Sequence, residues 1–439
     1  MGVRVLPRSV CFTQSKPTMP IKAAWILRLV FHPRHGLPRT SASSFRLYSI
    51  MMKLWSAIGV AGVLQPPKCT ESYKRANNTC MRKTSSYRRC KVAAGSDKQE
   101  TVGSDSTRGM PSLPFTVWAK LAAFSAVQLP NGGIRPALFS IGDRRAPAMP
   151  GPNVSGVRTA DIDIDASNGL WVRVFSPSAV AGNAPLPVVV YFHGGGFVLF
   201  SAASRLYDAF CRRLCLGLGA VVVSVNYRLA PQHRFPAAYD DGIATLRYLD
   251  ANALPADLVP VPVDVSNCFL AGDSAGGNIA HHVAQCWASM SSMSPPENIR
   301  LAGSVLIQPL FGGEERTEAE VELANACSSL TLANADFCWK QFLPEGATRD
   351  HVAAHVCGGD VNIAEAYPPA MVVVGGFDLL KDRHARYVEE LRRHGKLGRV
   401  VEYPDAIHGF YLFPEIDDSA KIVGDIKIFV DEHRSKPVV

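Results

Sequence analysis

The sequence predicts an α/β protein with a mostly parallel sheet and helices on both faces. Eight short runs of apolar, often β-branched residues recur between residues 162 and 403, and segments long enough for helices separate the later ones. Near-continuous apolar strands that alternate with helices indicate a parallel sheet that is buried on both sides. The first two runs, 162–164 and 171–175, lie close together in the chain. They predict a hairpin and therefore an antiparallel edge.

The ordered part is expected to begin with a helix at 113–129. Apolar residues recur there at helical spacing and Pro114 stands near the start. A loop rich in Gly and Pro follows at 130–154. After the hairpin, the apolar runs predict strands at 187–192, 220–227, 268–271, 304–310, 370–374 and 399–403. The segments between them predict helices at 239–252, 276–289 and 381–394.

One connection is too long to be a simple link between strands. Residues 312–369 are rich in Ala and Leu and contain Phe337, Trp339 and Phe342. A stretch of this length without structure of its own would be unusual in a compact domain. We therefore predict a helical insertion over the sheet edge, which forms a cap over a pocket together with residues 112–150.

The basic character of the chain is confined to its N-terminal part. Residues 1–100 hold 18 Lys or Arg and three acids, a net charge of +15, so the total of +8 leaves −7 (8 − 15) for the rest. The first 70 residues lack Asp and Glu, which is typical of an organelle transit peptide. The alternative is an unfolded upstream extension, with translation starting at Met51, Met52 or Met110. In both cases we expect 1–105 to be a disordered or removable leader and 106–439 to form the domain.

The mildly acidic body gives no reason to expect nucleic-acid binding. The apolar runs at 23–31 and 54–64 are too short to cross a bilayer as helices, so we expect no stable membrane span. The eleven cysteines contain no CxxC pair and no zinc-like spacing with His. Reduced thiols, no metal and a cytoplasmic or nuclear location are therefore expected, with the chloroplast or mitochondrion as the alternative if the leader is a transit peptide. The sequence does not predict an oligomeric state.

The strongest chemical signal is the sequence GDSAG at Gly272–Gly276, directly after a strand run and before a helical pattern. Its serine, Ser274, would sit on a sharp strand-to-helix turn, which requires small residues two positions to either side. Such a turn lifts the hydroxyl clear of the sheet and leaves the amide of Ala275 at a helix N-terminus. We predict that Ser274 is a nucleophile. The alternative is a glycine-rich turn with an incidental serine.

A second signal is the sequence HGGG at 193–196, at the end of the strand run 187–192. Three glycines allow the backbone to approach a substrate and to direct its amides at it. Preorganised amides of this kind stabilise a developing oxyanion. The alternative, a phosphate-binding loop, lacks a following Lys-Ser/Thr or a GxGxxG register. The predicted oxyanion hole is formed by the amides of Gly194, Gly195, Gly196 and Ala275.

A serine nucleophile of this type needs a base and an acid on later strands. The run 370–374 leads into Asp378, and the run 399–403 leads into His408. His408 would take the proton of Ser274, and Asp378 would fix the tautomer of His408. Asp382 and Asp405 are the rival acids, and Asp378 is favoured because it comes at the strand end.

Four other histidines have a simpler interpretation. His281 and His282 follow the elbow on its helix and are expected to be packing or surface residues. His351 and His355 have i, i+4 spacing, but they lack an intervening Glu and a third ligand. We predict no metal site there.

The motifs together resemble the hormone-sensitive-lipase branch of the α/β-hydrolases, and within it the plant carboxylesterases. The resemblance spans about residues 110–435. It rests on five segments: HGGGF at 193–197, NYRLAPQHRFPAAYDD at 226–241, GDSAGGNIAHHVA at 272–284, GGFDLLKD at 375–382 and DAIHGF at 405–410.

This resemblance implies an α/β-hydrolase fold with an eight-stranded sheet and a helical cap, and hydrolysis of small carboxylic esters without a cofactor. The family pattern also implies structural roles for Tyr227, Arg234 and Asp240 behind the site. Gibberellin receptors are relatives in which an aliphatic residue replaces the histidine that His408 matches, so its presence here favours an enzyme over a receptor-like binding protein. Dehydratases that use the same pocket are the other alternative.

Overall fold

A computed structural model describes residues 111–151, 155–179, 184–324, 329–358 and 361–435. The expected leader at 1–105 lies outside the described residues and remains a prediction. In chain order the elements are α3 (Phe115–Val127), α4 (Pro136–Gly142), β1 (Val157–Asp165), β2 (Leu170–Pro177), β3 (Leu186–Phe192), α5 (Arg205–Leu218), β4 (Val221–Asn226), α6 (Ala237–Ala251), β5 (Val263–Asp273), α7 (Ala275–Ser291), β6 (Leu301–Ile307), α8 (Glu318–Glu322), α9 (Leu332–Phe342), β7 (Ala370–Phe377), α10 (Lys381–Arg393), β8 (Gly398–Ile407), a 3₁₀ turn η2 (Phe410–Leu412) and α11 (Asp418–His433).

The strands form one eight-stranded sheet in the order β1-β2-β4-β3-β5-β6-β7-β8. The pairs β1–β2 and β2–β4 are antiparallel, and the other neighbours are parallel. The predicted α/β fold, its hairpin and its antiparallel edge are therefore confirmed. Because β3, β5, β6, β7 and β8 run in the same direction, their carboxyl ends meet at one edge of the sheet. Loops that follow these strands can bring distant residues together there.

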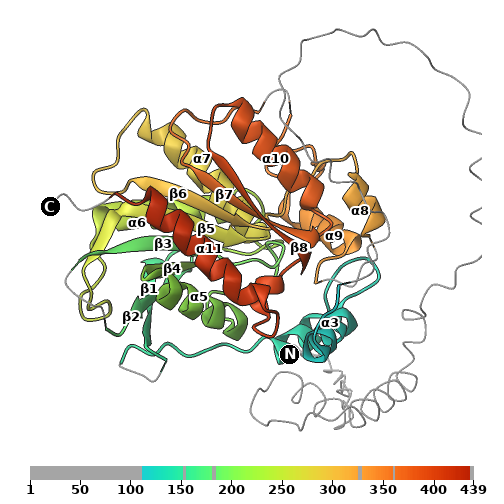
Figure 1. Cartoon of the computed structure of the whole chain (residues 1–439), viewed down its shortest axis with the longest axis horizontal. Helices are drawn as coiled ribbons and strands as arrows, with labels where there is room; N and C mark the ends of the chain where they lie inside the picture. The colour runs from blue at the N-terminus through green and yellow to red at the C-terminus, as the bar shows by residue number, and fades with distance from the viewer. Residues whose placement is uncertain (1–110, 152–154, 180–183, 325–328, 359–360, 436–439) are drawn as a thin grey trace, which may run out of the picture. The chain divides into compact units, whose positions relative to one another are not determined.

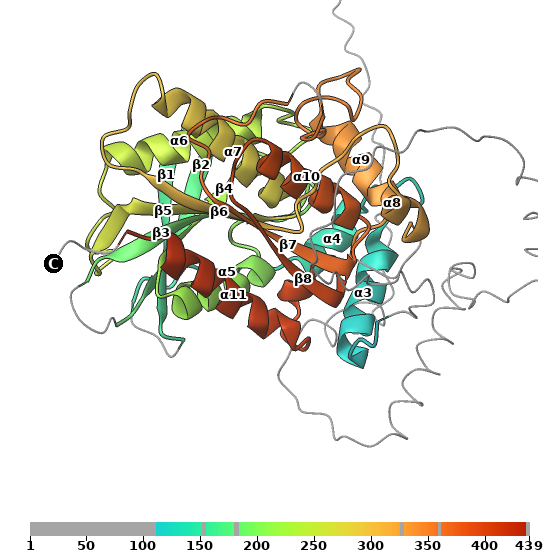
Figure 2. The ribbon, with the colours of Figure 1, turned by 45° about the horizontal axis from the view of Figure 1, so that its top comes forward.

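Helices cover both faces of the sheet, with α5 and α11 on one face and α6, α7 and α10 on the other (Figures 1 and 2). The alternation along β3 shows how the sequence achieves this. Val188 and Val190 belong to the core cluster beneath α6 and α7, whereas Val189 and Tyr191 belong to the cluster beneath α5 and α11. Successive side chains of a strand point to opposite faces, so a strand covered on both sides must be apolar throughout.

The insertion at 312–369 is less helical than expected. It contains only α8 and α9 among its described residues, and the rest is turns and irregular backbone. The predicted loop at 130–154 contains the short helix α4. The two predicted cap segments do touch, because Asn334 Nδ2 on α9 donates a hydrogen bond of 2.7 Å to the carbonyl oxygen of Gly132. In Figure 2, α3, α4, α8 and α9 gather on one side of the domain.

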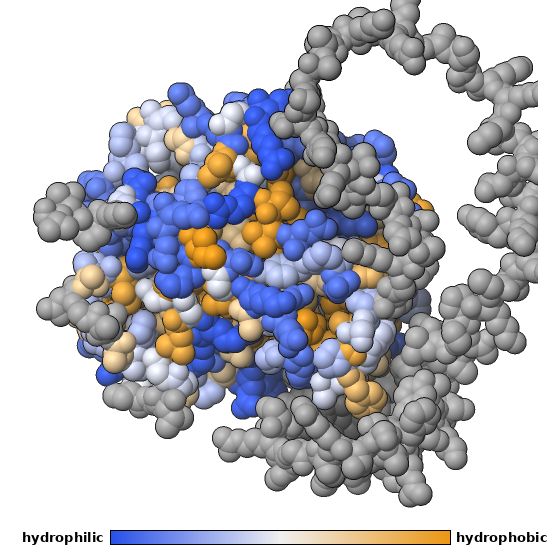
Figure 3. Space-filling model, in the orientation of Figure 1, coloured by the Kyte–Doolittle hydropathy of each residue, from blue (hydrophilic) through white to orange (hydrophobic). Residues whose placement is uncertain are grey.

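The surface seen in Figure 3 is a mosaic of hydrophilic residues with small, separated hydrophobic groups. Within the described ranges, no helix combines the length and the apolar composition needed to cross a bilayer. Six cysteines in the same ranges are unpaired: Cys211, Cys215, Cys268, Cys286, Cys338 and Cys357.

Candidate active site

Ser274 occupies a sharp turn between β5 and α7. Its backbone has φ 51° and ψ −119°, a conformation that is strained for a residue with a side chain and is concentrated at functional sites. The predicted need for small flanking residues is confirmed. A β-carbon at Gly272 would come within 2.2 Å of the Gly276 carbonyl oxygen, and one at Gly276 within 1.9 Å of the Phe192 oxygen.

The structure brings Ser274, His408 and Asp378 together at the carboxyl ends of β5, β8 and β7. His408 Nε2 lies 3.0 Å from Ser274 Oγ, and His408 Nδ1 lies 2.8 Å from Asp378 Oδ2. Both distances are within hydrogen-bonding range. The imidazole therefore bridges the hydroxyl and the carboxylate through its two nitrogens. Such a chain can pass a proton from the hydroxyl to the imidazole while the carboxylate stabilises the positive charge that results.

Asp378 is fully buried, and its charge is balanced by its partners. Burial opposes ionisation, but the charge and hydrogen bond of His408, together with His384 and the Leu380 amide, hold the pKa of the Asp378 carboxyl below its ordinary value. The amide of Leu380 donates to Asp378 Oδ1 at 3.0 Å. A carboxylate that stays ionised in this position can keep one imidazole nitrogen protonated and facing it.

Neither rival acid is hydrogen-bonded to His408 in the described structure. Asp382 Oδ2 accepts a hydrogen bond of 2.8 Å from the Ala319 amide at the start of α8. Asp405 lies within β8 and is exposed. The preference for Asp378 therefore agrees with the positions of all three carboxylates.

The glycine loop packs against the serine turn. A β-carbon at Gly194 would come within 2.4 Å of Asp273 Oδ2 and 3.0 Å of the Asp273 carbonyl oxygen. Gly195 and Gly196 have φ values of 109° and 63°, which favour glycine. Ala275 begins α7 directly after Ser274. Together these contacts place the loop beside Ser274, next to the helix N-terminus that Ala275 opens.

Tyr227 supports the glycine loop from behind through its contacts with His193. The Tyr227 hydroxyl donates a hydrogen bond of 2.8 Å to the His193 carbonyl oxygen, and its ring stacks on the imidazole with a centroid distance of 4.4 Å. Burial lowers the pKa of His193 to about 4. The imidazole is therefore neutral at physiological pH and does not place a positive charge behind the loop.

An unforeseen feature of the site is the environment of Asp273, the residue before the serine. Its carboxylate accepts three tyrosine hydroxyls: Tyr191 at 2.6 Å on Oδ1, and Tyr207 at 2.9 Å and Tyr411 at 2.7 Å on Oδ2. Burial raises the pKa of Asp273 in spite of these bonds. The tyrosines come from β3, α5 and η2, so Asp273 ties the turn to three separate elements. The three tyrosines are far apart in the sequence, so no local motif predicts that they contact Asp273.

The family-implied structural residues are confirmed in part. Arg234 donates to the carbonyl oxygens of Lys340 at 2.8 Å and Leu343 at 2.7 Å, and so anchors the end of α9. Asp240 is exposed. The structural role implied for it belongs to its neighbour Asp241, which accepts the Arg228 amide at 2.7 Å and pairs with the Arg228 guanidinium.

The remaining histidines pack as expected. His281 Nδ1 lies 2.9 Å from the Tyr387 hydroxyl and 3.1 Å from that of Tyr367, and the His282 ring stacks on Tyr239. No group of three or more His, Cys, Asp or Glu with the geometry for a metal ion is present in the described part of the chain.

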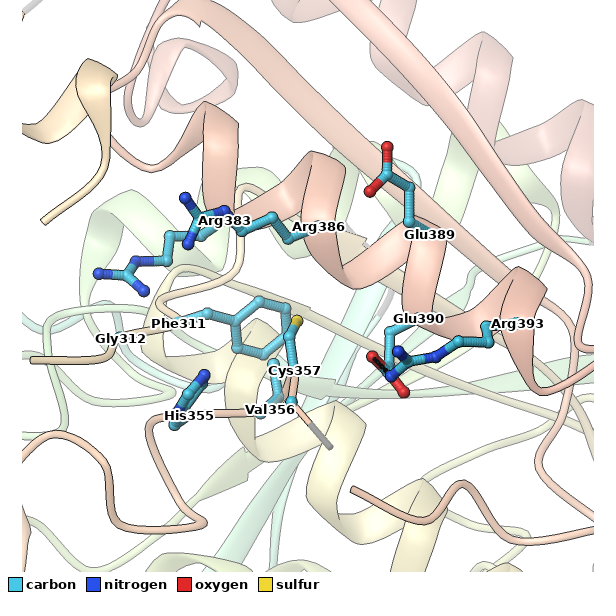
Figure 4. Close-up of a pocket in the computed structure, with 11 residues that line it drawn as sticks. Phe311, Gly312, His355, Val356, Cys357, Arg383, Arg386, Glu389, Glu390 and Arg393 are labelled. Atoms are coloured by element: carbon cyan, nitrogen blue, oxygen red, sulfur yellow. Dashed lines mark hydrogen bonds and ion pairs between the residues drawn. The ribbon is translucent and has the colours of Figure 1, made fainter. Parts of the chain in front are cut away.

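A hollow of about 370 Å³ lies beside α10. Figure 4 shows three arginines of α10 along one wall, with Phe311, His355 and Cys357 opposite them. The three are Arg383, Arg386 and Arg393. Two of the arginines are paired: Arg383 with Glu320 at 3.0 Å, and Arg393 with Glu390. Ser274, Asp378 and His408 do not line this hollow.

Comparison with known proteins identifies the family. A sequence profile described as the alpha/beta hydrolase fold matches residues 189–412, which include all three bridged side chains. The chain belongs to the α/β-hydrolases. A second profile, the carboxylesterase family, matches residues 144–232 of this α/β-hydrolase and so includes the glycine loop.

Relatives of this α/β-hydrolase include both receptors and esterases. A gibberellin receptor of Arabidopsis thaliana is 37% identical over 338 residues, which cover 73% of this chain and 94% of the receptor. The 3-O-acetylpapaveroxine carboxylesterase of Papaver somniferum is 35% identical and covers 62% of this chain and 90% of its own. An esterase structure from Pyrobaculum calidifontis superposes with a TM-score of 0.53 at 31% identity, covering 63% of this chain and 84% of the esterase.

Proposed function

We propose that the protein is a carboxylesterase that hydrolyses small carboxylic esters through an acyl-enzyme intermediate. The observation that carries this proposal is the continuous hydrogen-bonded chain from Ser274 through His408 to Asp378. A protein that only binds a ligand has no need for an imidazole held between a hydroxyl and a buried carboxylate. The carboxylesterase relatives and esterase structures support the same chemistry.

The proposed reaction has two halves. Ser274 Oγ attacks the ester carbonyl carbon while His408 Nε2 takes the hydroxyl proton. The carbonyl oxygen becomes an oxyanion held by the amides of the glycine loop and Ala275. When the bond to the alcohol breaks, His408 gives its proton to the leaving oxygen. A water molecule then attacks the acyl-serine by the same route, which releases the carboxylic acid and restores Ser274.

Receptor-like binding is the second candidate. It is favoured by the 37% identity to a gibberellin receptor across almost the whole of that protein. The buried position of the site is compatible with it, since Ser274 is 7% exposed and His408 is 5% exposed.

Turnover of short-chain aryl esters separates the two candidates. The esterase proposal expects hydrolysis by the wild-type protein and a loss of at least about 1,000-fold in Ser274→Ala. Ser176→Ala is the matched control, because Ser176 is a buried serine on β2, away from the serine turn. Its activity should stay close to wild type. A folded wild-type protein without turnover would contradict the proposal and favour the receptor-like alternative.

A further inference from the structure

Gln308, directly after β6, has an unusual backbone conformation. It is fully buried and has φ 45°, in the left-handed region that non-glycine residues rarely adopt. Its amide donates to the Val373 carbonyl oxygen at 3.0 Å, which anchors it to β7. Strained residues of this kind persist where surrounding contacts hold them, and they cluster at functional sites. The contacts of its side chain indicate what this conformation achieves.

The side chain of Gln308 forms hydrogen bonds with the backbone on both sides of His408. Its Nε2 donates to the Ile407 carbonyl oxygen at 3.2 Å, and its Oε1 accepts the Gly409 amide at 2.8 Å. Both functional ends of the amide are therefore used, one on each neighbour of the histidine. Gly375 on β7 leaves the space that the Gln308 side chain occupies. A β-carbon at Gly375 would come within 2.5 Å of Gln308 Nε2.

The end of β6, directly before Gln308, also contacts the backbone of Ser274. The carbonyl oxygen of Ile307, one residue before Gln308, accepts the Ser274 amide at 2.9 Å. Ile307 therefore contacts the backbone at Ser274, and its neighbour Gln308 contacts the backbone on both sides of His408. The two sets of contacts come from one short segment, which links the backbone at Ser274 to the backbone around His408.

We infer that Gln308 is a positioning residue that sets the alignment of His408 with Ser274. This inference rests on the proposed esterase function. The side chain does not touch the reacting atoms, and it acts through the peptide groups that carry the imidazole. A misplacement of about 1 Å in such an arrangement can cost on the order of 100-fold in rate.

The chain offers a matched control in Gln285. Its Nε2 donates to the Asn362 carbonyl oxygen at 2.8 Å, and its Oε1 accepts the Ala364 amide at 3.0 Å. It therefore bridges two residues that flank a third, as Gln308 does, but on a loop without a predicted site residue. Gln308→Met and Gln285→Met each remove both hydrogen bonds at similar side-chain length.

The test compares kcat and KM for a short-chain aryl ester in the wild type, Gln308→Met and Gln285→Met. We expect kcat to fall by about 10- to 100-fold in Gln308→Met, with KM within about twofold, and both constants to remain near wild type in Gln285→Met. A kcat in Gln308→Met close to that of Gln285→Met would overturn the inference.

Gln308→Glu provides a second variant if Gln308→Met does not fold. The carboxylate can accept the Gly409 amide, and only its protonated form can donate to the Ile407 carbonyl oxygen. Its activity relative to the wild type should therefore rise as the pH is lowered, because protonation restores the missing donor. A ratio that is constant with pH would contradict the positioning role.

Hydrogen exchange distinguishes failure of this inference from failure of the proposed function. The amide of Gly409 should exchange faster in Gln308→Met than in the wild type, and at the wild-type rate in Gln285→Met. This readout does not depend on turnover. A wild-type protein without esterase activity would refute the proposed function, while hydrogen exchange would still test the contacts of Gln308 with Ile407 and Gly409. Unchanged exchange at Gly409 in Gln308→Met would refute the positioning role alone.

Discussion

The thiol of Cys338 on α9 lies directly against the backbone of Gly196. A β-carbon placed on Gly196 would come within 2.1 Å of the Cys338 sulfur. The insertion therefore reaches the glycine loop itself and does not merely lie above it. Gly196 has no space for a side chain, and α9 helps to fix the loop that we propose holds the oxyanion.

Gly196→Ala should abolish most of the esterase activity. The new methyl group would push either α9 or the loop out of place, and a lost oxyanion donor costs about 100-fold or more in kcat. Gly219→Ala is the control, because Gly219 has nearly the same φ, 61° against 63°, and no atom within 4 Å of the added β-carbon. It should lower the free energy of unfolding by about 1 kcal/mol and leave activity unchanged. Ester hydrolysis is measured for both variants, and thermal unfolding shows that each is folded. Equal activities in the two folded variants would contradict the role proposed for the Gly196 backbone.

Asp378→Asn should lower kcat by about 1,000- to 10,000-fold. The amide would remove the negative charge that faces His408 Nδ1 and would permit the wrong imidazole tautomer. Asp382→Asn tests the rival acid, whose carboxylate contacts the Ala319 amide instead of the histidine. We expect its kcat to stay within a few-fold of wild type. A large loss in Asp382→Asn with a small one in Asp378→Asn would reverse the assignment.

The protein should lose stability as the pH falls below the ordinary pKa of histidine, partly because of His281. Burial, and then the nearby His282, lower the pKa of His281 well below 6.5 in the folded protein. The unfolded chain therefore binds a proton that the folded chain does not, so the stabilisation is complete above about pH 6.5 and declines at lower pH.

His281→Phe should weaken this dependence. The variant removes the imidazole nitrogen that contacts the hydroxyls of Tyr367 and Tyr387, and these hydroxyls lie 3.0 Å apart, where they can pair with each other. Between about pH 7 and about pH 5 the wild type should lose more of its unfolding free energy than the variant. Urea denaturation at a series of pH values measures this difference, and parallel curves would show that His281 is not responsible.

Much of the sheet could be predicted because its strands are buried on both faces. The predicted strand at 187–192 nearly coincides with β3, Leu186–Phe192. The strand predicted at 399–403 stopped short of the end of β8 at Ile407, since the polar residues of this edge strand interrupt the apolar run.

Besides the short helix α4, two longer helices, α5 and α11, were not predicted, although their buried residues carry a readable signal. In α5 the buried apolar residues recur at helical spacing, which is the signature of an amphipathic helix. They are Tyr207, Phe210, Cys211, Leu214, Cys215 and Leu218. The other helix, α11, has its buried residues spread more thinly, at Ile422, Ile426, Phe429 and Val430.

The bridged side chains were predictable because each follows a strand within a recognisable local motif. The residues that support them were not. Gln308 acts on His408 from 100 positions away, and the tyrosines around Asp273 come from three elements. These partners are defined by tertiary packing, which leaves no periodic or local pattern in the sequence.

Covalent labelling with a fluorophosphonate probe tests the central claim most directly, because the probe reacts with a serine activated by a base. Intact-mass and peptide mass spectrometry should show one adduct per chain, on Ser274, and the labelling should be nearly abolished in His408→Ala. A folded wild-type protein that remains unlabelled, or that carries the adduct on another serine, would contradict the assignment of Ser274 as the nucleophile.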